Sequence, residues 1–125
     1  MRRWIAENMT ADPADVLKGE RERAAKFVSV AKDGSVVLKP NDKFTARQKT
    51  LAVFVGKLYS EAAGYSTDAV VTYPDLASTL NLPDGTIRPM VKELRDDRLI
   101  ESVENGRHAL PRANLKRALD ELENA

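Results

Sequence analysis

A helical period of apolar residues runs from about residue 46 to 63 and is the clearest pattern in the chain. Thr45 and Gln48 carry the residue types of a capping box at its start. Gly64 follows where a helix commonly ends in a left-handed residue. Together these signals predict a helix over this segment. Its apolar positions are Leu51, Val55, Leu58 and Ala62.

The part of the chain before this helix predicts a second helix and a β-hairpin. A helix from about 13 to 26 fits Pro13 as a first-turn residue, although Gly19 lies in its middle. Two β-rich runs, 27–31 and 35–39, flank an Asp-Gly turn. Residues 1–44 are therefore expected to form an N-terminal helix and hairpin extension.

After Gly64 the pattern changes to short elements. Val70 and Val71 predict a short strand. Thr72 and Asp75 predict a second capping box, at the start of a two-turn helix that ends near Asn81. After a tight connection the helical period restarts, with Ile87, Val91 and Leu94 as its apolar positions.

Pro89 limits where this next helix, expected over 84–97, can begin. A proline in a helix interior removes a hydrogen bond and costs about 3 kcal/mol. If Thr86 caps the helix, Pro89 is its third residue and costs little. We therefore favour a start between Asp84 and Thr86.

The last segment predicts a hairpin and a closing helix. Asn105-Gly106 lies between two short β-rich runs that span 99–110, a strong hairpin signal. Leucines at helical spacing predict a final helix from about 113 to 124. The predicted fold class is α+β, mainly helical.

Two stretches of the sequence resemble winged helix-turn-helix transcription regulators. Residues 71–82 look like the strand and second helix of that family, and residues 86–100 look like its recognition helix running into the wing. The Gly-Thr-x-x-Pro-x-x-x-x-Leu spacing is similar to regulators of the PadR type, and the rest is equally similar to archaeal MarR-like proteins. One departure is Arg98, where the family usually has a glycine. The resemblance covers roughly residues 45 to 122 and implies a winged helix-turn-helix domain over 45–125.

Composition and net charge exclude some kinds of chemistry and set a condition for nucleic-acid binding. The chain has 125 residues, 31% of them charged, and no cysteine, which excludes disulfides and thiolate chemistry. We expect a cytoplasmic protein without a signal peptide or membrane span. The net charge of +1 does not by itself indicate a nucleic-acid binder, so a DNA-binding role requires basic residues to be sorted onto one face.

The helix over 84–97 offers such a face. Arg88, Lys92 and Arg95 form a stripe beside its apolar positions. Arg88 can read guanine edges or hold phosphate, whereas Lys92 suits phosphate. The alternative is a solvated face with ion pairs inside the helix.

Other candidate contacts come from neighbouring elements. The start of the helix can approach a phosphate through backbone N–H groups. On the wing, Arg107 is the best candidate for a phosphate or the minor groove, whereas a lone histidine is more often structural. Near the starts of the two earlier helices, contact with the DNA backbone and simple solvation are equally good interpretations. The remaining predicted DNA contacts are Thr86, Pro89, His108, Tyr73, Arg47 and Lys49.

The leading functional hypothesis is a homodimeric, double-stranded DNA-binding transcription regulator. It places helix 84–97 in the major groove and wing 99–110 on the backbone or in the minor groove. The alternative is a winged helix that binds a protein partner inside a larger assembly, which the small net charge favours. No catalytic residue, cofactor site or metal site is expected, since phosphate-loop and nucleophile-elbow sequences are missing.

Overall fold

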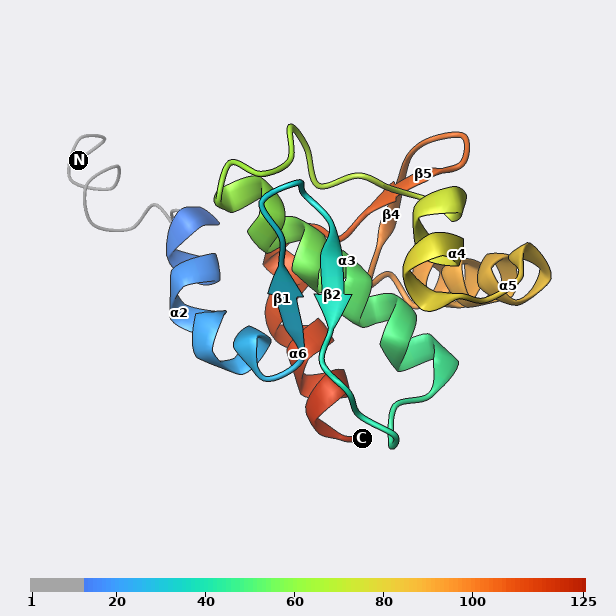
Figure 1. Cartoon of the computed structure of the whole chain (residues 1–125), viewed down its shortest axis with the longest axis horizontal. Helices are drawn as coiled ribbons and strands as arrows, with labels where there is room; N and C mark the ends of the chain where they lie inside the picture. The colour runs from blue at the N-terminus through green and yellow to red at the C-terminus, as the bar shows by residue number, and fades with distance from the viewer. Residues whose placement is uncertain (1–12) are drawn as a thin grey trace, which may run out of the picture.

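The computed structural model describes residues 13–125, so residues 1–12 of the predicted N-terminal extension lie outside the described part. Within it, α-helices and two small antiparallel sheets make an α+β fold (Figure 1). The elements in chain order are α2 (Pro13–Ala25), β1 (Val28–Val30), β2 (Val36–Leu38), α3 (Ala46–Ala62), β3 (Val71–Thr72), α4 (Tyr73–Leu80), α5 (Asp84–Asp96), β4 (Glu101–Glu104), β5 (Arg107–Ala109), a 3-10 turn (Arg112–Asn114) and α6 (Leu115–Glu123).

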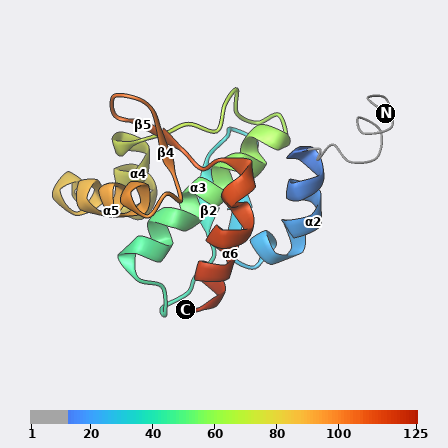
Figure 2. The same cartoon turned by 180° about the vertical axis from the view of Figure 1, so that it is seen from behind.

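Helix α3 lies at the centre and contacts most other elements. The β1–β2 hairpin crosses one side of it, and α6 lies on the other (Figures 1 and 2). Leu51, Phe54 and Val55 of α3 are almost completely buried between these layers. The long apolar period of the sequence thus corresponds to a helix covered on several sides.

Helix α2 is attached to both α3 and α6. Tyr59 of α3 donates its hydroxyl to the carbonyl oxygen of Leu17 at 2.7 Å, and burial raises the pKa of Tyr59 to about 12. Arg23 pairs with Asp120 and Glu123 of α6. Helix α2, the hairpin, α3 and α6 contribute to one continuous apolar core, so the described part of the extension shares its core with the rest of the chain.

Both predicted capping boxes are confirmed. Gln48 N–H donates to the Thr45 hydroxyl, and Thr45 N–H donates back to the Gln48 side chain. Thr72 and Asp75 exchange the same pair of hydrogen bonds at the start of α4. Gly64, with φ of +79°, follows the end of α3 as predicted.

Helices α4 and α5 are joined by only three residues and pack against each other. Asn81 makes the turn possible by adopting a left-handed conformation with φ of 53°. Strand β3, just before α4, pairs with β5, so the second sheet has the order β3-β5-β4. In this sheet Val71 lies opposite His108. The pairing fixes the β4–β5 hairpin beside the start of α4.

The start of α5 lies within the predicted range, between Asp84 and Thr86. The helix begins at Asp84 with Pro83 as its N-cap, and Thr86 does not cap it. Pro89 therefore lies inside the helix, and its missing N–H leaves the carbonyl of Gly85 without the usual partner. Gly85 is exposed, so water can satisfy that carbonyl.

Arg98 takes the conformation for which glycine is the usual residue. Its φ is 60°. Leu99 N–H donates to the Leu94 carbonyl and Arg98 N–H to the Arg95 carbonyl, the pair of bonds that ends a helix in a Schellman motif. The chain therefore makes the same turn without glycine, at the energetic cost of a Cβ in left-handed geometry.

We expect Arg98→Gly to stabilise the protein by about 1 kcal/mol, because glycine removes the energetic cost of a Cβ in left-handed geometry. The greater backbone entropy of glycine in the unfolded chain offsets part of this gain. Urea unfolding followed by circular dichroism measures the change. Arg98→Ala, which keeps the Cβ, is the matched control and should give no gain. Equal stability of the glycine and alanine variants would show that the left-handed conformation carries no cost here.

Among the helices of residues 13–125, none is long and apolar enough to cross a membrane.

Candidate nucleic-acid interface

Helix α5 presents three different sides to its surroundings. Ile87, Val91 and Leu94 are completely buried against the core. Most of its charged side chains are exposed. Apart from the pair of Asp84 with Arg88, their ionic contacts separate the acidic from the basic side chains.

Two acidic side chains toward the C-terminal end of α5, Glu93 and Asp97, turn toward Arg47 of α3. Arg47 of α3 binds Glu93 at 2.8 Å and Asp97 at 2.5 Å through one guanidinium nitrogen. Its other two nitrogens bind both carboxylate oxygens of Glu121 on α6, at 3.0 and 2.8 Å. These hydrogen bonds raise the pKa of Arg47, so the guanidinium stays charged. One arginine thus offsets negative charge from Glu93, Asp97 and Glu121.

The basic side chains lie on the side of α4 and the β4–β5 hairpin. The Arg88 guanidinium lies 4.4 Å from the ring centre of Tyr73, at the start of α4. It also pairs with Asp84 one turn earlier, at 2.5 Å. Arg95 approaches His108 of β5, with 3.4 Å between Nη1 and Nε2. Lys92 is exposed and falls between Arg88 and Arg95 on the helix surface.

We call Arg88, Lys92 and Arg95 the basic stripe. Its residues are exposed, and Arg88 lies next to the aromatic ring of Tyr73. The predicted stripe therefore exists as a geometric feature, and Tyr73 lies against it.

His108 is placed differently from the prediction that it contacts DNA. It is 2% exposed, so its side chain lacks the accessibility that such a contact requires. Its ring packs against Tyr73, with 5.6 Å between the ring centres. Burial, and secondarily the charge of Arg95, lower the pKa of His108. The residue supports the junction of α4, α5 and β5 as a neutral side chain.

The lowered pKa of His108 predicts the direction in which the stability of the protein changes with pH. The unfolded chain binds a proton near pH 6.5, whereas the folded state resists it, so stability is fully present above about pH 6.5 and falls as the pH drops below that value. We expect the free energy of unfolding of His108→Gln to fall less than that of wild type between about pH 7.5 and 5.5, because the variant lacks this titrating group.

Two measurements check this expectation. Urea unfolding of wild type and His108→Gln across that pH range gives the difference in slope. Proton NMR titrates the imidazole directly, since the chain has one histidine. A midpoint at or above 6.5 in the folded protein would contradict the buried neutral assignment.

The β4–β5 hairpin carries both signs of charge. Arg107 pairs with Glu104 at 3.0 Å and lies 3.7 Å from Asp68. A shift in register between Ser102 and Glu104 interrupts the ladder, and Val103 is 53% exposed there. Arg107 therefore lies at the edge of the site with its charge partly compensated.

The other predicted contacts occupy separate places. Thr86 is half-buried and Pro89 is exposed, both in the first half of α5. Lys49 is exposed and lines a hollow between the β2–α3 connection and the end of α4. The guanidinium of Arg47 is engaged by three carboxylates, which gives it a structural role that the sequence reasoning missed. Glu93 and Asp97, four apart, signalled one acidic helix side, but the sequence alone does not identify their partner.

Among the described residues, no group of three or more histidine or carboxylate side chains is placed to hold a metal ion. Comparison with known proteins found no matching family model, no matching curated protein and no matching solved structure.

Proposed function

We propose that this protein is a winged helix-turn-helix protein that binds double-stranded DNA, with α5 in the major groove and the β4–β5 hairpin against the backbone. The observation that carries the proposal is the separation of charge around α5. Arg47 holds Glu93 and Asp97 on one side, and the basic stripe is exposed on the other, where Arg88 also pairs with Asp84. Phosphate binding follows such local potential rather than net charge.

The order of the elements supports the same proposal. A central helix, a short strand, a two-turn helix, a second helix after a three-residue connection and then a hairpin is the order of a winged helix-turn-helix. Tyr73 and Arg88 bring an aromatic ring and a guanidinium together beside the hairpin. Both groups can contact a phosphate or a base edge. Regulation of transcription by a homodimer is the role we propose for such binding.

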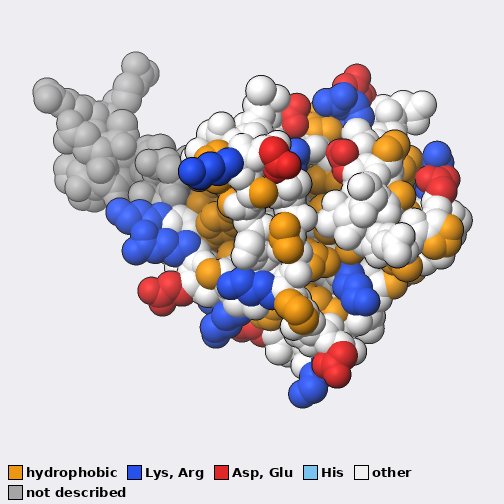
Figure 3. Space-filling model, viewed as in Figure 1, with side chains coloured by type: hydrophobic (Ala, Val, Ile, Leu, Met, Phe, Trp, Pro, Cys, Tyr) orange, Lys and Arg blue, Asp and Glu red, His pale blue; other side chains and the backbone are white. Residues whose placement is uncertain are grey.

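A protein-binding role is the second candidate, because the net charge is only +1. Figure 3 shows acidic and basic side chains interspersed on the face that carries the β1–β2 hairpin. Such a surface suits neither long-range steering toward DNA nor strong non-specific binding. A protein partner becomes the better explanation if the basic stripe has no affinity for a duplex.

The test is fluorescence anisotropy of labelled duplex DNA of random sequence, titrated with the protein at about 50 and 200 mM salt. We expect wild type to bind at low salt and to lose affinity as the salt rises, because phosphate contacts release counterions. Arg88→Glu/Lys92→Glu should weaken binding at least about tenfold, since it reverses two charges on the basic stripe.

The matched control is Lys32→Glu/Lys43→Glu, which changes the net charge equally on exposed residues outside α4, α5 and the β4–β5 hairpin. It should lose much less affinity than the stripe variant. Equal losses would mean that binding reflects total charge and not this face. No wild-type binding at low salt would refute the DNA proposal and favour the protein partner.

A further inference from the structure

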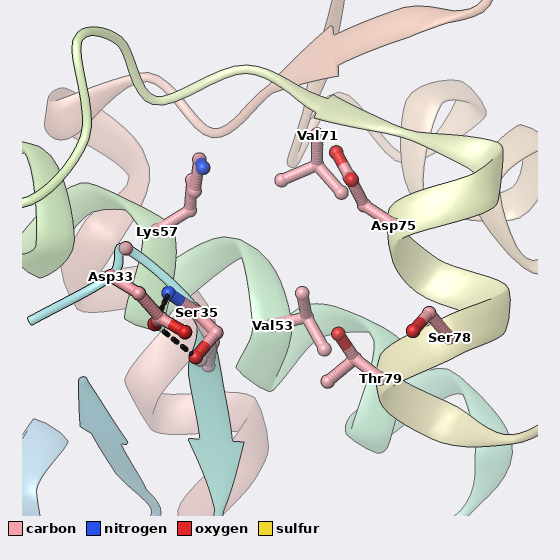
Figure 4. A pocket seen from close by; sticks show the side chains of 10 residues that line it. Asp33, Ser35, Val53, Lys57, Val71, Asp75, Ser78 and Thr79 are labelled. Carbon is pink, nitrogen blue, oxygen red and sulfur yellow. Dashed lines mark hydrogen bonds between the residues drawn. The ribbon is translucent and has the colours of Figure 1, made fainter. Parts of the chain in front are cut away.

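A cavity of about 300 Å³ lies away from the basic stripe, between the β1–β2 hairpin, α3 and α4. This volume corresponds to about ten water molecules, and it is at the lower end of the range for small-molecule sites. Figure 4 shows Asp33, Ser35 and Lys57 on one side of it and Asp75, Ser78 and Thr79 on the other. The cavity therefore suits a small polar molecule that touches both sides.

The base of the cavity is apolar. Val53 of α3 and Val71 of β3 line it and are almost completely buried, with 3% and 2% of their surfaces exposed. They offer a short hydrophobic contact between the two polar sides. A small aliphatic group of a ligand can pack on this apolar base.

Charges of opposite sign face the cavity from different helices without neutralising each other. Lys57 on α3 and Asp75 on α4 both line it, but neither belongs to an ion pair within residues 13–125. The ammonium group of Lys57 donates only one long hydrogen bond, to Ser66 at 3.3 Å. One oxygen of Asp75 accepts the cap bond from Thr72 N–H. Both groups thus keep hydrogen-bonding capacity for a ligand.

The hydroxyls on α4 add further capacity. Ser78 and Thr79 line the cavity, and neither side chain has a hydrogen-bond partner among the described residues. The opposite side is fixed in place by Gly34, whose carbonyl accepts a hydrogen bond from Ser60 at 3.1 Å. A Cβ on Gly34 would come within 2.8 Å of Tyr65 and Ser66, so the hairpin tip is closely seated on the end of α3.

Asp33 gives the cavity a second carboxylate. It is held by Ser35, whose N–H and hydroxyl both donate to one of its oxygens, at 2.9 and 2.6 Å. These hydrogen bonds lower the pKa of Asp33 and keep it ionised. With Lys57 and Asp75, the lining carries one positive and two negative charges, which disfavours ligands with a net negative charge.

We propose that this cavity binds a small free amino acid as a zwitterion, with its carboxylate at Lys57 and its ammonium group at Asp75. The aliphatic side chain lies on Val53 and Val71, and the α4 hydroxyls complete the polar contacts. Because α4 packs against α5, the bound ligand joins the hairpin and α3 to the helix pair of the proposed DNA interface. Any effect on DNA rests on the proposed function, whereas ligand binding to the protein alone does not.

The test titrates the standard L-amino acids one at a time into the full chain without DNA, by isothermal calorimetry and by amide NMR. We expect saturable binding of at least one aliphatic amino acid below about 10 mM, with amide shifts concentrated at residues 33–36 and 75–79. Lys57→Met and Asp75→Asn should each weaken binding at least about tenfold, the loss expected for one charged hydrogen bond. Asparagine keeps an oxygen that can accept the cap bond of Thr72.

Lys32→Met and Asp42→Asn are the matched controls, because both residues are exposed and neither lines the cavity. They should bind as wild type does. The proposal is overturned if no amino acid binds saturably, if the amide shifts of wild type map elsewhere, or if Lys57→Met and Asp75→Asn leave affinity unchanged. The proposal is also overturned if the amino acid that binds and the corresponding amine without a carboxylate have equal affinity. Amino-acid binding by a protein with no DNA affinity would refute only the proposed function.

Discussion

Arg47→Met should destabilise the protein by about 2 to 3 kcal/mol at low ionic strength. The guanidinium is the common partner of Glu93, Asp97 and Glu121, and its side chain is 20% exposed. Methionine keeps much of the apolar stem but leaves three carboxylates close together without a positive charge. The value lies between those of an exposed ion pair and a buried one, because the carboxylates are 30% to 50% exposed.

Urea unfolding at two salt concentrations measures this prediction. The loss should shrink as salt rises, because part of it is repulsion between partly exposed carboxylates. Arg23→Met is the matched control, since Arg23 also binds three carboxylates, Glu20, Asp120 and Glu123. Asp120 is 68% exposed, so we expect a smaller loss there. A loss at Arg47 no larger than at Arg23 would contradict its assignment as the connection between α3, α5 and α6.

Gly56→Ala should destabilise the protein by about 2 kcal/mol, although alanine is the better helix former. A Cβ at this position in α3 would lie 2.4 Å from one methyl group of Val36 on β2 and 3.0 Å from the other. Both residues are buried, so the hairpin has to move away from α3. A contact as close as 2.4 Å places the cost near the upper end of the roughly 1 to 3 kcal/mol typical of overpacking. The gain of about 1 kcal/mol in helix propensity leaves a net loss of about 2 kcal/mol.

A double-mutant cycle separates the close contact from other effects. Val36→Ala removes both methyl groups and should by itself cost about 1 to 2 kcal/mol through the space that it leaves. In Gly56→Ala/Val36→Ala the new methyl group occupies part of that space, so the combined loss should be smaller than the sum of the two single losses. Gly19→Ala, where a Cβ meets nothing within 4 Å, is the control for helix propensity alone. Additive losses in the cycle would show that the close approach of Val36 is not the reason for the loss in Gly56→Ala.

Local sequence signals identified the elements well, because their causes lie within a few residues. The capping boxes at Thr45 and Thr72 form through contacts three residues apart, so they are readable from the sequence. The Asp33-Gly34 and Asn105-Gly106 turns similarly require a glycine that can adopt positive φ, and both glycines do. The periodicity of α5 also assigned its buried residues correctly.

The limits of the local reading are visible in α5 and its flanks. The sequence places the start of α5 between Asp84 and Thr86, and the helix begins at Asp84, which puts Pro89 inside it. Arg98 occupies a left-handed position without the usual glycine, because the hydrogen bonds of Leu99 and Arg98 fix the turn. In both cases the chain adopts a conformation that a local preference of about 1 to 3 kcal/mol disfavours.

The sequence by itself determined the order of helices and strands and the stripe of basic residues on α5, because both follow from spacing along one element. Only the tertiary structure decided which charged side chains are paired within the protein and which remain available to a ligand or partner. It sets Arg47 against carboxylates 46 to 74 residues away, buries His108 and places Asp33, Lys57 and Asp75 around one cavity. Such contacts join elements whose relative positions depend on the packing of the whole core, and no local pattern encodes that packing.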